Sequence, residues 1–152
     1  MKRIAVFPGS FDPFTIGHES IVRRGLDLFD ELVVAVGINS TKATLYPLEQ
    51  RVDWIRQIFR NEPRVSADSF EGLTVAYCKS RNIRFILRGL RTSSDFGFER
   101  GIATVNKAME PSIETVFLQA LPEHSSISST IIRDIVRNGG DASQFVPHAI
   151  RL

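Results

Sequence analysis

Continuous apolar runs alternate with amphipathic stretches along this chain, and this alternation limits the possible folds more than any other feature. The apolar runs cover residues 4–7, 32–38, 85–87 and 115–118, with a shorter candidate at 64–67. Strands that lack polar alternation are typical of a parallel sheet whose two faces are both covered by helices. The sequence therefore predicts an α/β fold, with a Rossmann-like, doubly wound sheet of five parallel strands in a single domain over residues 1–152.

The amphipathic stretches predict the helices that cover this sheet. They include residues 18–29, 48–59, 73–80, 96–109 and 131–136. Pro47 suits a helix start, while Pro111 and the Gly139–Gly140 pair suit helix ends. Pro8 follows the first apolar run directly and is expected to interrupt the first strand.

The charge of the chain favours a small anionic ligand over a nucleic acid. Nineteen basic and 17 acidic residues leave a formal net charge of +2, and the basic residues are locally dense only at Arg88, Arg91 and Arg100. This distribution fits a pocket for a small polyanion better than a duplex. A nucleic acid is therefore not an expected partner. The first residues lack the long apolar region of a signal peptide or a membrane span, so a membrane is not an expected partner either.

Cys78 is the only cysteine, so no internal disulfide can form. This usage suits a reducing compartment, and we expect the chain in the cytoplasm. A catalytic thiol is the alternative, although the neighbouring Tyr77 and Lys79 form no recognisable nucleophile motif.

Polar clusters follow four of the predicted strands. They cover residues 10–18, 39–42, 88–91 and 124–130. Ligands of open parallel sheets bind beyond the carboxyl ends of the strands, which meet at one edge of the sheet. The four clusters are therefore expected to converge on one crevice.

The first cluster has the layout of a phosphate site. Gly9 permits a close approach of the backbone to a ligand, Ser10 offers a hydroxyl group, and His18 lies in the first turn of a helix. The free N–H groups and the dipole at a helix N-terminus favour anions and lower the pKa of an imidazole, so neutral His18 can donate to a phosphate oxygen. The plainer alternative is an ordinary βα loop with a surface histidine.

The next two clusters add cations. Lys42 offers a flexible point charge, and the guanidinium groups of Arg88 and Arg91 match phosphate oxygens. Pairing of these arginines with Asp95 or Glu99 is an alternative that can coexist with ligand binding.

The last cluster adds hydroxyl groups. Residues 125–130 carry five of them, and one suffices to cap the last helix, so the others predict a second phosphate cradle. The chain lacks a P-loop, a dinucleotide fingerprint, a zinc cluster and a Gly-x-Ser-x-Gly elbow. Without an evident covalent nucleophile, this set of side chains predicts phosphoryl or nucleotidyl transfer by positioning and charge stabilisation.

Two motifs make the chain similar to a known group of enzymes. Residues 15–18, Thr-Ile-Gly-His, resemble the (T/H)xGH signature of the nucleotidylyltransferase superfamily, and residues 127–133, Ile-Ser-Ser-Thr-Ile-Ile-Arg, resemble its ISSTxIR signature. Residues 8–13, 86–91 and 95–96 resemble one family within it, the bacterial phosphopantetheine adenylyltransferases. The resemblance covers nearly the whole chain in order and length.

This resemblance implies a reaction and an assembly. ATP and 4′-phosphopantetheine, with Mg²⁺ as cofactor, would give dephospho-coenzyme A and pyrophosphate in the penultimate step of coenzyme A biosynthesis. The substrate phosphate would attack the α-phosphorus of ATP directly, without a covalent enzyme intermediate. The resemblance also implies a homohexamer and allows feedback binding of coenzyme A.

Roles for individual residues are implied by position. His18, Lys42 and Arg91 are implied in catalysis, with His18 stabilising the charged transition state. Binding of the phosphopantetheine substrate is implied for Ser10, Lys42, Thr74 and Arg88. Binding of ATP is implied for Ser10, Phe11, His18, Gly89, Leu90, Arg91, Glu99, His124, Ser125, Ser126, Ile127, Ser128, Ser129 and Thr130. No residue is assigned as a metal ligand.

Some positions depart from the residues that are frequent in the family. They include Thr74, Phe98, His124 and Asp134, and they concern the adenine and pantetheine contacts rather than the type of reaction. Two alternatives stay open at this point. One is a sister nucleotidylyltransferase that acts on nicotinate mononucleotide or glycerol 3-phosphate, and the other is a non-catalytic nucleotide-binding module.

Overall fold

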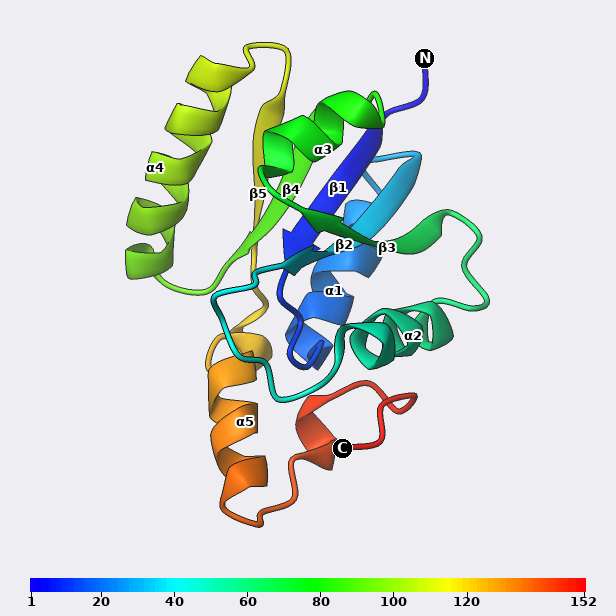
Figure 1. The fold of residues 1–152 in the computed structure, drawn as a ribbon, viewed down its shortest axis with the longest axis vertical. Coiled ribbons are helices and arrows are strands. Elements are labelled where there is room, and N and C mark those ends of the chain that lie inside the picture. Colours follow the sequence, from blue (N-terminus) through cyan, green and yellow to red (C-terminus); the bar gives the residue numbers. More distant parts are fainter.

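A five-stranded, all-parallel sheet in the order β3-β2-β1-β4-β5 organises the computed structural model, which describes residues 1–152 (Figure 1). The strands are β1 Ile4–Gly9, β2 Glu31–Ile38, β3 Val65–Glu71, β4 Phe85–Leu90 and β5 Glu114–Gln119. The helices are α1 Ile16–Gly25, α2 Leu48–Ile58, α3 Thr74–Ser80, α4 Ser93–Met109 and α5 Ser129–Arg137, with short 3₁₀ helices η1 Pro122–His124 and η2 Ser143–Phe145. This architecture confirms the predicted doubly wound parallel sheet.

Alternate residues of the central strands build a hydrophobic cluster on each face of the sheet, because successive side chains of a strand point to opposite faces. Ala5 and Phe7 of β1 join the larger cluster, to which α1, α2 and α5 contribute. Val6 joins the smaller cluster, to which α3 contributes Val75 and Cys78. Both faces of the central strands are thus buried, which explains why their sequences are continuously apolar. None of the helices combines the length and apolar character that crossing a membrane requires.

The sheet opens between β1 and β4. Strand β1 pairs with β2 along its whole length, but with β4 only at Ala5 and Val6. Pro8 does not interrupt β1, as the sequence had suggested, but lies within it opposite Ala35 of β2. A proline is tolerated here because this part of β1 has no partner in β4 that would need its missing N–H. The gap leaves the Pro8 carbonyl free to accept a hydrogen bond from Arg88.

All five strands are longer than their apolar runs, and β3 and β4 extend furthest beyond them at their carboxyl ends. Strand β4 continues through Arg88, Gly89 and Leu90, because β5 pairs with it as far as Gln119. Strand β3 runs to Glu71 as a polar edge strand that pairs with β2 only. Pairing with a neighbouring strand, rather than hydrophobicity, therefore decides where these strands end.

Candidate functional site

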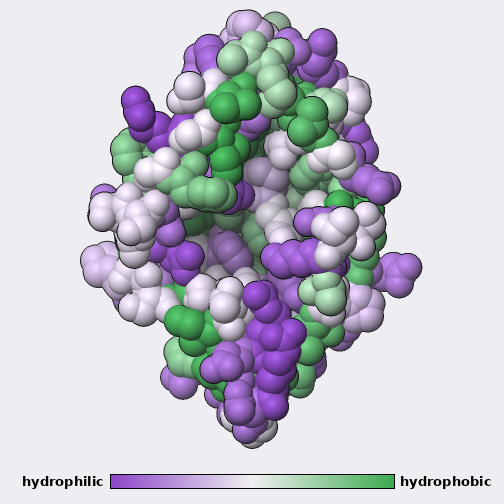
Figure 2. Space-filling view, turned by 60° about the vertical axis from the view of Figure 1, so that its left-hand side comes forward, coloured by the Kyte–Doolittle hydropathy of each residue, from purple (hydrophilic) through white to green (hydrophobic).

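Two adjoining cavities open at the carboxyl ends of β1 and β4, where the strand order reverses. The larger has a volume of about 300 Å³ and contains His18, and the smaller has a volume of about 250 Å³ and contains Thr74. We call them the His18 cavity and the Thr74 cavity. Both are lined by Pro8, Gly9, Ser10, Arg88 and Glu99. A ligand can therefore extend from one cavity into the other, and Figure 2 shows the molecule hollowed on the side where α4 and α5 lie.

Most of the residues predicted for the site meet here. The His18 cavity is lined by Ser10, Phe11, His18, Lys42, Arg88, Gly89, Arg91, Glu99, His124, Ile127, Ser128, Ser129 and Thr130. Thr74 lines the other cavity. Leu90, Ser125 and Ser126 line neither, and the Ser125 hydroxyl donates instead to the carbonyl of Pro122. The four polar clusters of the sequence thus converge on one crevice, as predicted.

Helix α4 supplies one wall of the Thr74 cavity. Glu99, Ala103 and Asn106 all line it, because residues three and four positions apart lie on the same face of a helix. Of the positions that depart from the family pattern, Phe98 and Asp134 are exposed and line neither cavity.

The imidazole of His18 is fixed by the start of α1. The N–H group of Thr15 donates to Nδ1 of His18 at 3.0 Å, and the Thr15 hydroxyl accepts from the His18 backbone N–H at 3.2 Å. This reciprocal arrangement is a capping box in which histidine takes the place of the usual glutamate or glutamine. Because Nδ1 accepts a hydrogen bond, the neutral ring carries its proton on Nε2, which is left as a donor.

The environment of His18 keeps the ring neutral. Burial and, to a smaller extent, the nearby guanidinium groups of Arg88 and Arg91 together lower the pKa of His18 to about 3. The sequence predicted a lowered pKa from the helix N-terminus alone. At neutral pH the site therefore offers a neutral hydrogen-bond donor among cations.

Arg88 is held as a rigid fork between the two cavities. Its Nε and Nη2 atoms donate to the two carboxylate oxygens of Glu99 at 2.9 and 2.6 Å, and Nη1 donates to the carbonyl of Pro8. The predicted pairing with an acidic residue is therefore present, and the paired guanidinium still lines both cavities. A bidentate pair fixes the plane of the guanidinium group.

Arg91 connects the β4 end to the last polar cluster. Its side chain lies 3.3 Å from the Asp95 carboxylate and donates to the carbonyl of Ile127 at 3.3 Å. Among the hydroxyl groups of that cluster, Ser128 caps α5 by accepting from the N–H of Ile131, and Ser129 donates to the carbonyl of Pro13. Ser128 therefore supplies the one cap that the sequence predicted among these hydroxyl groups. The N-terminus of α5 opens into the same cavity as the N-terminus of α1.

Sequence reasoning missed a buried polar connection between the loops of the site. The carboxylate of Asp12 is 3% exposed and accepts from the backbone N–H groups of Leu45 and Tyr46 at 2.8 and 2.9 Å. Buried Arg51 of α2 donates to the carbonyls of Ser10 and Tyr46. These bonds tie the loop that carries Lys42 to the loop after β1. The sequence shows Asp12 only as an acidic residue in a predicted loop. Its partners lie more than thirty residues away, so the local sequence does not reveal this connection.

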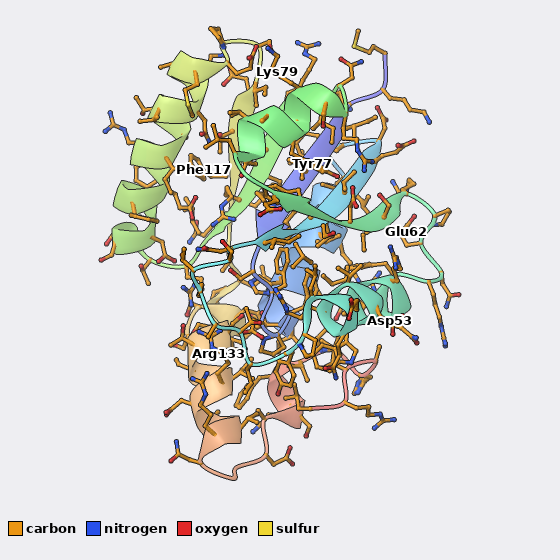
Figure 3. All side chains as sticks on the ribbon, viewed as in Figure 1. Asp53, Glu62, Tyr77, Lys79, Phe117 and Arg133 are labelled. Carbon is orange, nitrogen blue, oxygen red and sulfur yellow. The ribbon has the colours of Figure 1, made fainter.

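Arg133 is a second residue of the site that the sequence left without a role. It lies on α5 (Figure 3) and lines the His18 cavity. Its Nη1 donates to the carbonyl of Asp12 at 2.8 Å, so α5 is also fastened to the loop after β1. Its place in the ISSTxIR-like motif was the available signal.

The thiol of Cys78 is not a candidate nucleophile. Cys78 is fully buried in the cluster beneath α3, and burial raises the pKa of its thiol to about 11. A thiol with such a pKa carries almost no thiolate at neutral pH.

Comparisons with known proteins agree with this site. Residues 6–135 match the family model described as cytidylyltransferase-like. The chain is 49% identical to a phosphopantetheine adenylyltransferase of Flavobacterium psychrophilum, over 99% of both chains. It is 50% identical to one of Leptospira biflexa, over 99% of this chain and 94% of the relative.

A solved structure shares the fold at a greater distance in sequence. The putative nicotinate-nucleotide adenylyltransferase of Vibrio parahaemolyticus superposes with a TM-score of 0.73 at 20% identity, over 98% of this chain and 96% of the other. This likeness concerns the fold alone. Taken with the close relatives and the family model, the chain belongs to the cytidylyltransferase-like proteins and, among them, to the phosphopantetheine adenylyltransferase family.

Proposed function

We propose that this chain transfers the adenylyl group of ATP to 4′-phosphopantetheine, giving dephospho-coenzyme A and pyrophosphate. The observation that carries the proposal is the pair of cavities that meet at Ser10, Arg88 and Glu99. Two substrates that occupy one cavity each would bring their reacting phosphates together at this junction. The names of the relatives indicate which two substrates these are.

The arrangement of residues favours direct transfer. A phosphate oxygen of phosphopantetheine would attack the α-phosphorus of ATP, and the bond from that phosphorus to the bridging oxygen of pyrophosphate would break, with pyrophosphate keeping the electron pair. Negative charge builds on the phosphoryl oxygens in this step, and a fixed neutral donor stabilises it without reorganising. Nε2–H of His18 suits this role, and Lys42, Arg88 and Arg91 supply the surrounding positive charge.

Magnesium is expected with the nucleotide rather than in a cage built by the chain. The carboxylates that line the His18 cavity are Asp95 and Glu99, and both are held by arginines. No group of three acidic, histidine or cysteine side chains is arranged to hold a metal ion. Mg²⁺ commonly binds through substrate phosphates with few protein ligands, which agrees with this donor set. We therefore treat it as part of the Mg-ATP substrate.

The experiment that tests the proposal is release of pyrophosphate from Mg-ATP. The acceptor would be 4′-phosphopantetheine, with nicotinate mononucleotide and glycerol 3-phosphate tested in parallel. Release with the first acceptor alone is the expected result. Release with another acceptor would keep the chemistry but change the substrate, and release with none would favour the alternative of a non-catalytic nucleotide-binding module.

The role of His18 is tested by replacing it with alanine. His18→Ala should keep the affinity for ATP nearly unchanged and lower kcat by at least about 10²-fold, as for loss of a preorganised donor to the transition state. ATP affinity by calorimetry and kcat from pyrophosphate release separate the two effects. An equal loss of binding and rate would contradict the role.

We further propose that the chain forms a homohexamer, that coenzyme A binds in feedback, and that the chain acts in the cytoplasm. Self-association is supported by the apolar side chains that α4 leaves exposed, among them Phe98, Ile102 and Val105.

Feedback binding is supported by the joined cavities, because coenzyme A contains both an adenylate and a pantetheine half. Sedimentation analysis and inhibition by coenzyme A would test the first two.

A further inference from the structure

Three phenylalanine rings surround the imidazole of His18. The centroids of Phe7, Phe11 and Phe14 lie 6.0, 5.0 and 5.2 Å from the centroid of the imidazole. Phe11 is 5.2 Å from each of the other two rings, so the three form a continuous wall. None of them is more than 4% exposed. We call this group the phenylalanine box.

The box draws on separate parts of the chain. Phe7 comes from β1, Phe11 from the loop that follows, and Phe14 from the residues just before α1. Phe14 is backed by Phe59, at a centroid distance of 5.9 Å, so the wall is supported from the core. The rings cannot shift freely in such a packed setting, because closely packed interiors leave side chains few alternative positions.

The backbone at Phe11 shows that the position of its ring is enforced. Phe11 has a φ of 47°, in the left-handed region that a bulky residue rarely adopts. This conformation places the ring over Gly9, where an added Cβ would lie only 2.9 Å from the ring. The ring also stands nearly perpendicular to the imidazole, at 86°. A backbone conformation of this kind persists only where the surrounding structure over-determines it, and such residues cluster at functional sites.

We propose that Phe7, Phe11 and Phe14 are positioning residues for adenylyl transfer, which hold the His18 imidazole in one orientation with Nε2–H directed to the cleft. The inference rests on the proposed function. The single hydrogen bond from Thr15 to Nδ1 fixes one edge of the ring but leaves it free to tilt about that bond. The box removes this freedom and excludes water from the faces of the ring.

Other charged or titratable groups near His18 belong to the cleft, and none replaces the box. They are Lys42 from the loop after β2, Arg88 and Arg91 from the β4 end, Asp95 and Glu99 from α4, His124 from η1 and Arg133 from α5. Because replacing a phenylalanine removes none of these groups, and Phe29→Leu controls for a general disturbance of the core, a change in His18 specific to the box variants reports the box itself.

The test compares the same substitution inside and outside the box. Phe14→Leu and Phe7→Leu shorten the wall, and Phe29→Leu is the matched control. Phe29 is 5% exposed and belongs to the same core, but its aromatic neighbour is Phe85 rather than His18. Thermal unfolding of each full-length variant would establish that it is folded before it is compared.

Two readouts follow the orientation and the protonation of His18. Box variants should raise the pKa of His18 in an NMR titration without substrates, and should lower kcat about 10-fold or more while KM for ATP changes less than about 3-fold, as for a misplaced catalytic group. Phe29→Leu should leave both readouts within about 2-fold or the error of the titration. Box variants that behave like Phe29→Leu, or that lose kcat with an unchanged His18 titration, would overturn the proposal. If the wild-type chain transfers no adenylyl group, the proposed function fails, while the titration still decides whether the box controls His18.

Discussion

At the scale of single residues, Arg88 uses only part of its hydrogen-bonding capacity to hold its neighbours. A guanidinium group has five N–H donors, and Arg88 uses one on Nε, one on Nη1 and one on Nη2 for Glu99 and the Pro8 carbonyl. One donor on each of Nη1 and Nη2 stays available to an anion at the junction of the cavities. The same pair keeps the Glu99 carboxylate from repelling that anion.

Removal of Arg88 should therefore harm phosphopantetheine binding in two ways. Arg88→Ala removes two donors and also leaves the carboxylate of Glu99, a residue that is 9% exposed, without a partner. An uncompensated charge of this kind costs about 2 kcal/mol or more, so KM for phosphopantetheine should rise about 30-fold or more. KM for ATP should change less.

The double variant Arg88→Ala/Glu99→Gln separates the two contributions. It removes the unpaired charge of Glu99 but does not restore the donors of Arg88. It should therefore recover part of the affinity for phosphopantetheine. A change confined to the ATP dependence would contradict the assignment of Arg88 to the second substrate.

The residue types of the site could be predicted from the sequence, as could the pairing of its arginines with acidic residues, but the bonds between distant loops and those around His18 could not. His18 and Arg88 stood out because they follow buried strands and match known motifs. The acceptor role of Nδ1 in His18 depends on the N–H of Thr15, and the neutral state depends on burial of the ring among phenylalanines for which the sequence indicated no role toward His18. Such properties arise from the surroundings of a side chain and not from its type.

At the scale of elements, Asp12 joins three segments that line the His18 cavity. Its carboxylate holds the backbone of the loop that carries Lys42, and its carbonyl accepts from Arg133 of α5. Because Asp12 itself belongs to the loop after β1, the three segments cannot move independently. This explains a buried carboxylate in a loop, which would otherwise be costly.

Replacement of Asp12 should loosen this connection. Asp12→Ala leaves the N–H groups of Leu45 and Tyr46 without acceptors, and should lower the free energy of unfolding by about 2–4 kcal/mol. It should also raise KM for phosphopantetheine, because the Lys42 loop loses its anchor. Urea unfolding and steady-state kinetics measure the two effects.

Asp53→Ala is the matched control for Asp12→Ala. Asp53 lies exposed on α2 (Figure 3) and contacts only the neighbouring turn through Gln57. Its replacement should change the free energy of unfolding by less than about 0.5 kcal/mol. Similar losses in the two variants would mean that the buried connection does not stabilise the loop.

The order and type of the elements could be predicted well, and their ends less well. Apolar runs identify β1 and β2 because both of their faces are buried. The polar end of β3 and the Arg88–Leu90 end of β4 belong to strands only because a neighbour pairs with them. Pairing of this kind joins residues far apart in sequence, so local patterns do not reveal it.

At the scale of the whole molecule, the parting of β1 from β4 creates the site. The sheet is continuous at its amino ends and opens after Val6, so the polar side chains at the carboxyl ends of these strands face a shared cleft. The neutral His18 lies in this cleft among Lys42, Arg88 and Arg91. A cationic surrounding favours phosphates and at the same time disfavours protonation of the imidazole.

Burial of the His18 imidazole, together with these cations, links the stability of the whole molecule to pH. The pKa of His18 is near 6.5 in an unfolded chain and about 3 in the folded one, so between these values the unfolded state binds a proton that the folded state does not. Acidification from pH 7.5 to 5.0 should therefore lower the free energy of unfolding of the wild type, relative to His18→Gln, by up to about 2 kcal/mol. The difference between the two proteins should level off about one pH unit above the unfolded-state pKa of 6.5, because the unfolded state no longer binds the proton there. Urea unfolding of both proteins at the two pH values measures this difference directly, and all other titrating groups cancel in the comparison. A difference that is the same at pH 7.5 and 5.0 would mean that His18 takes up its proton equally in both states, and that the cleft does not hold the imidazole neutral.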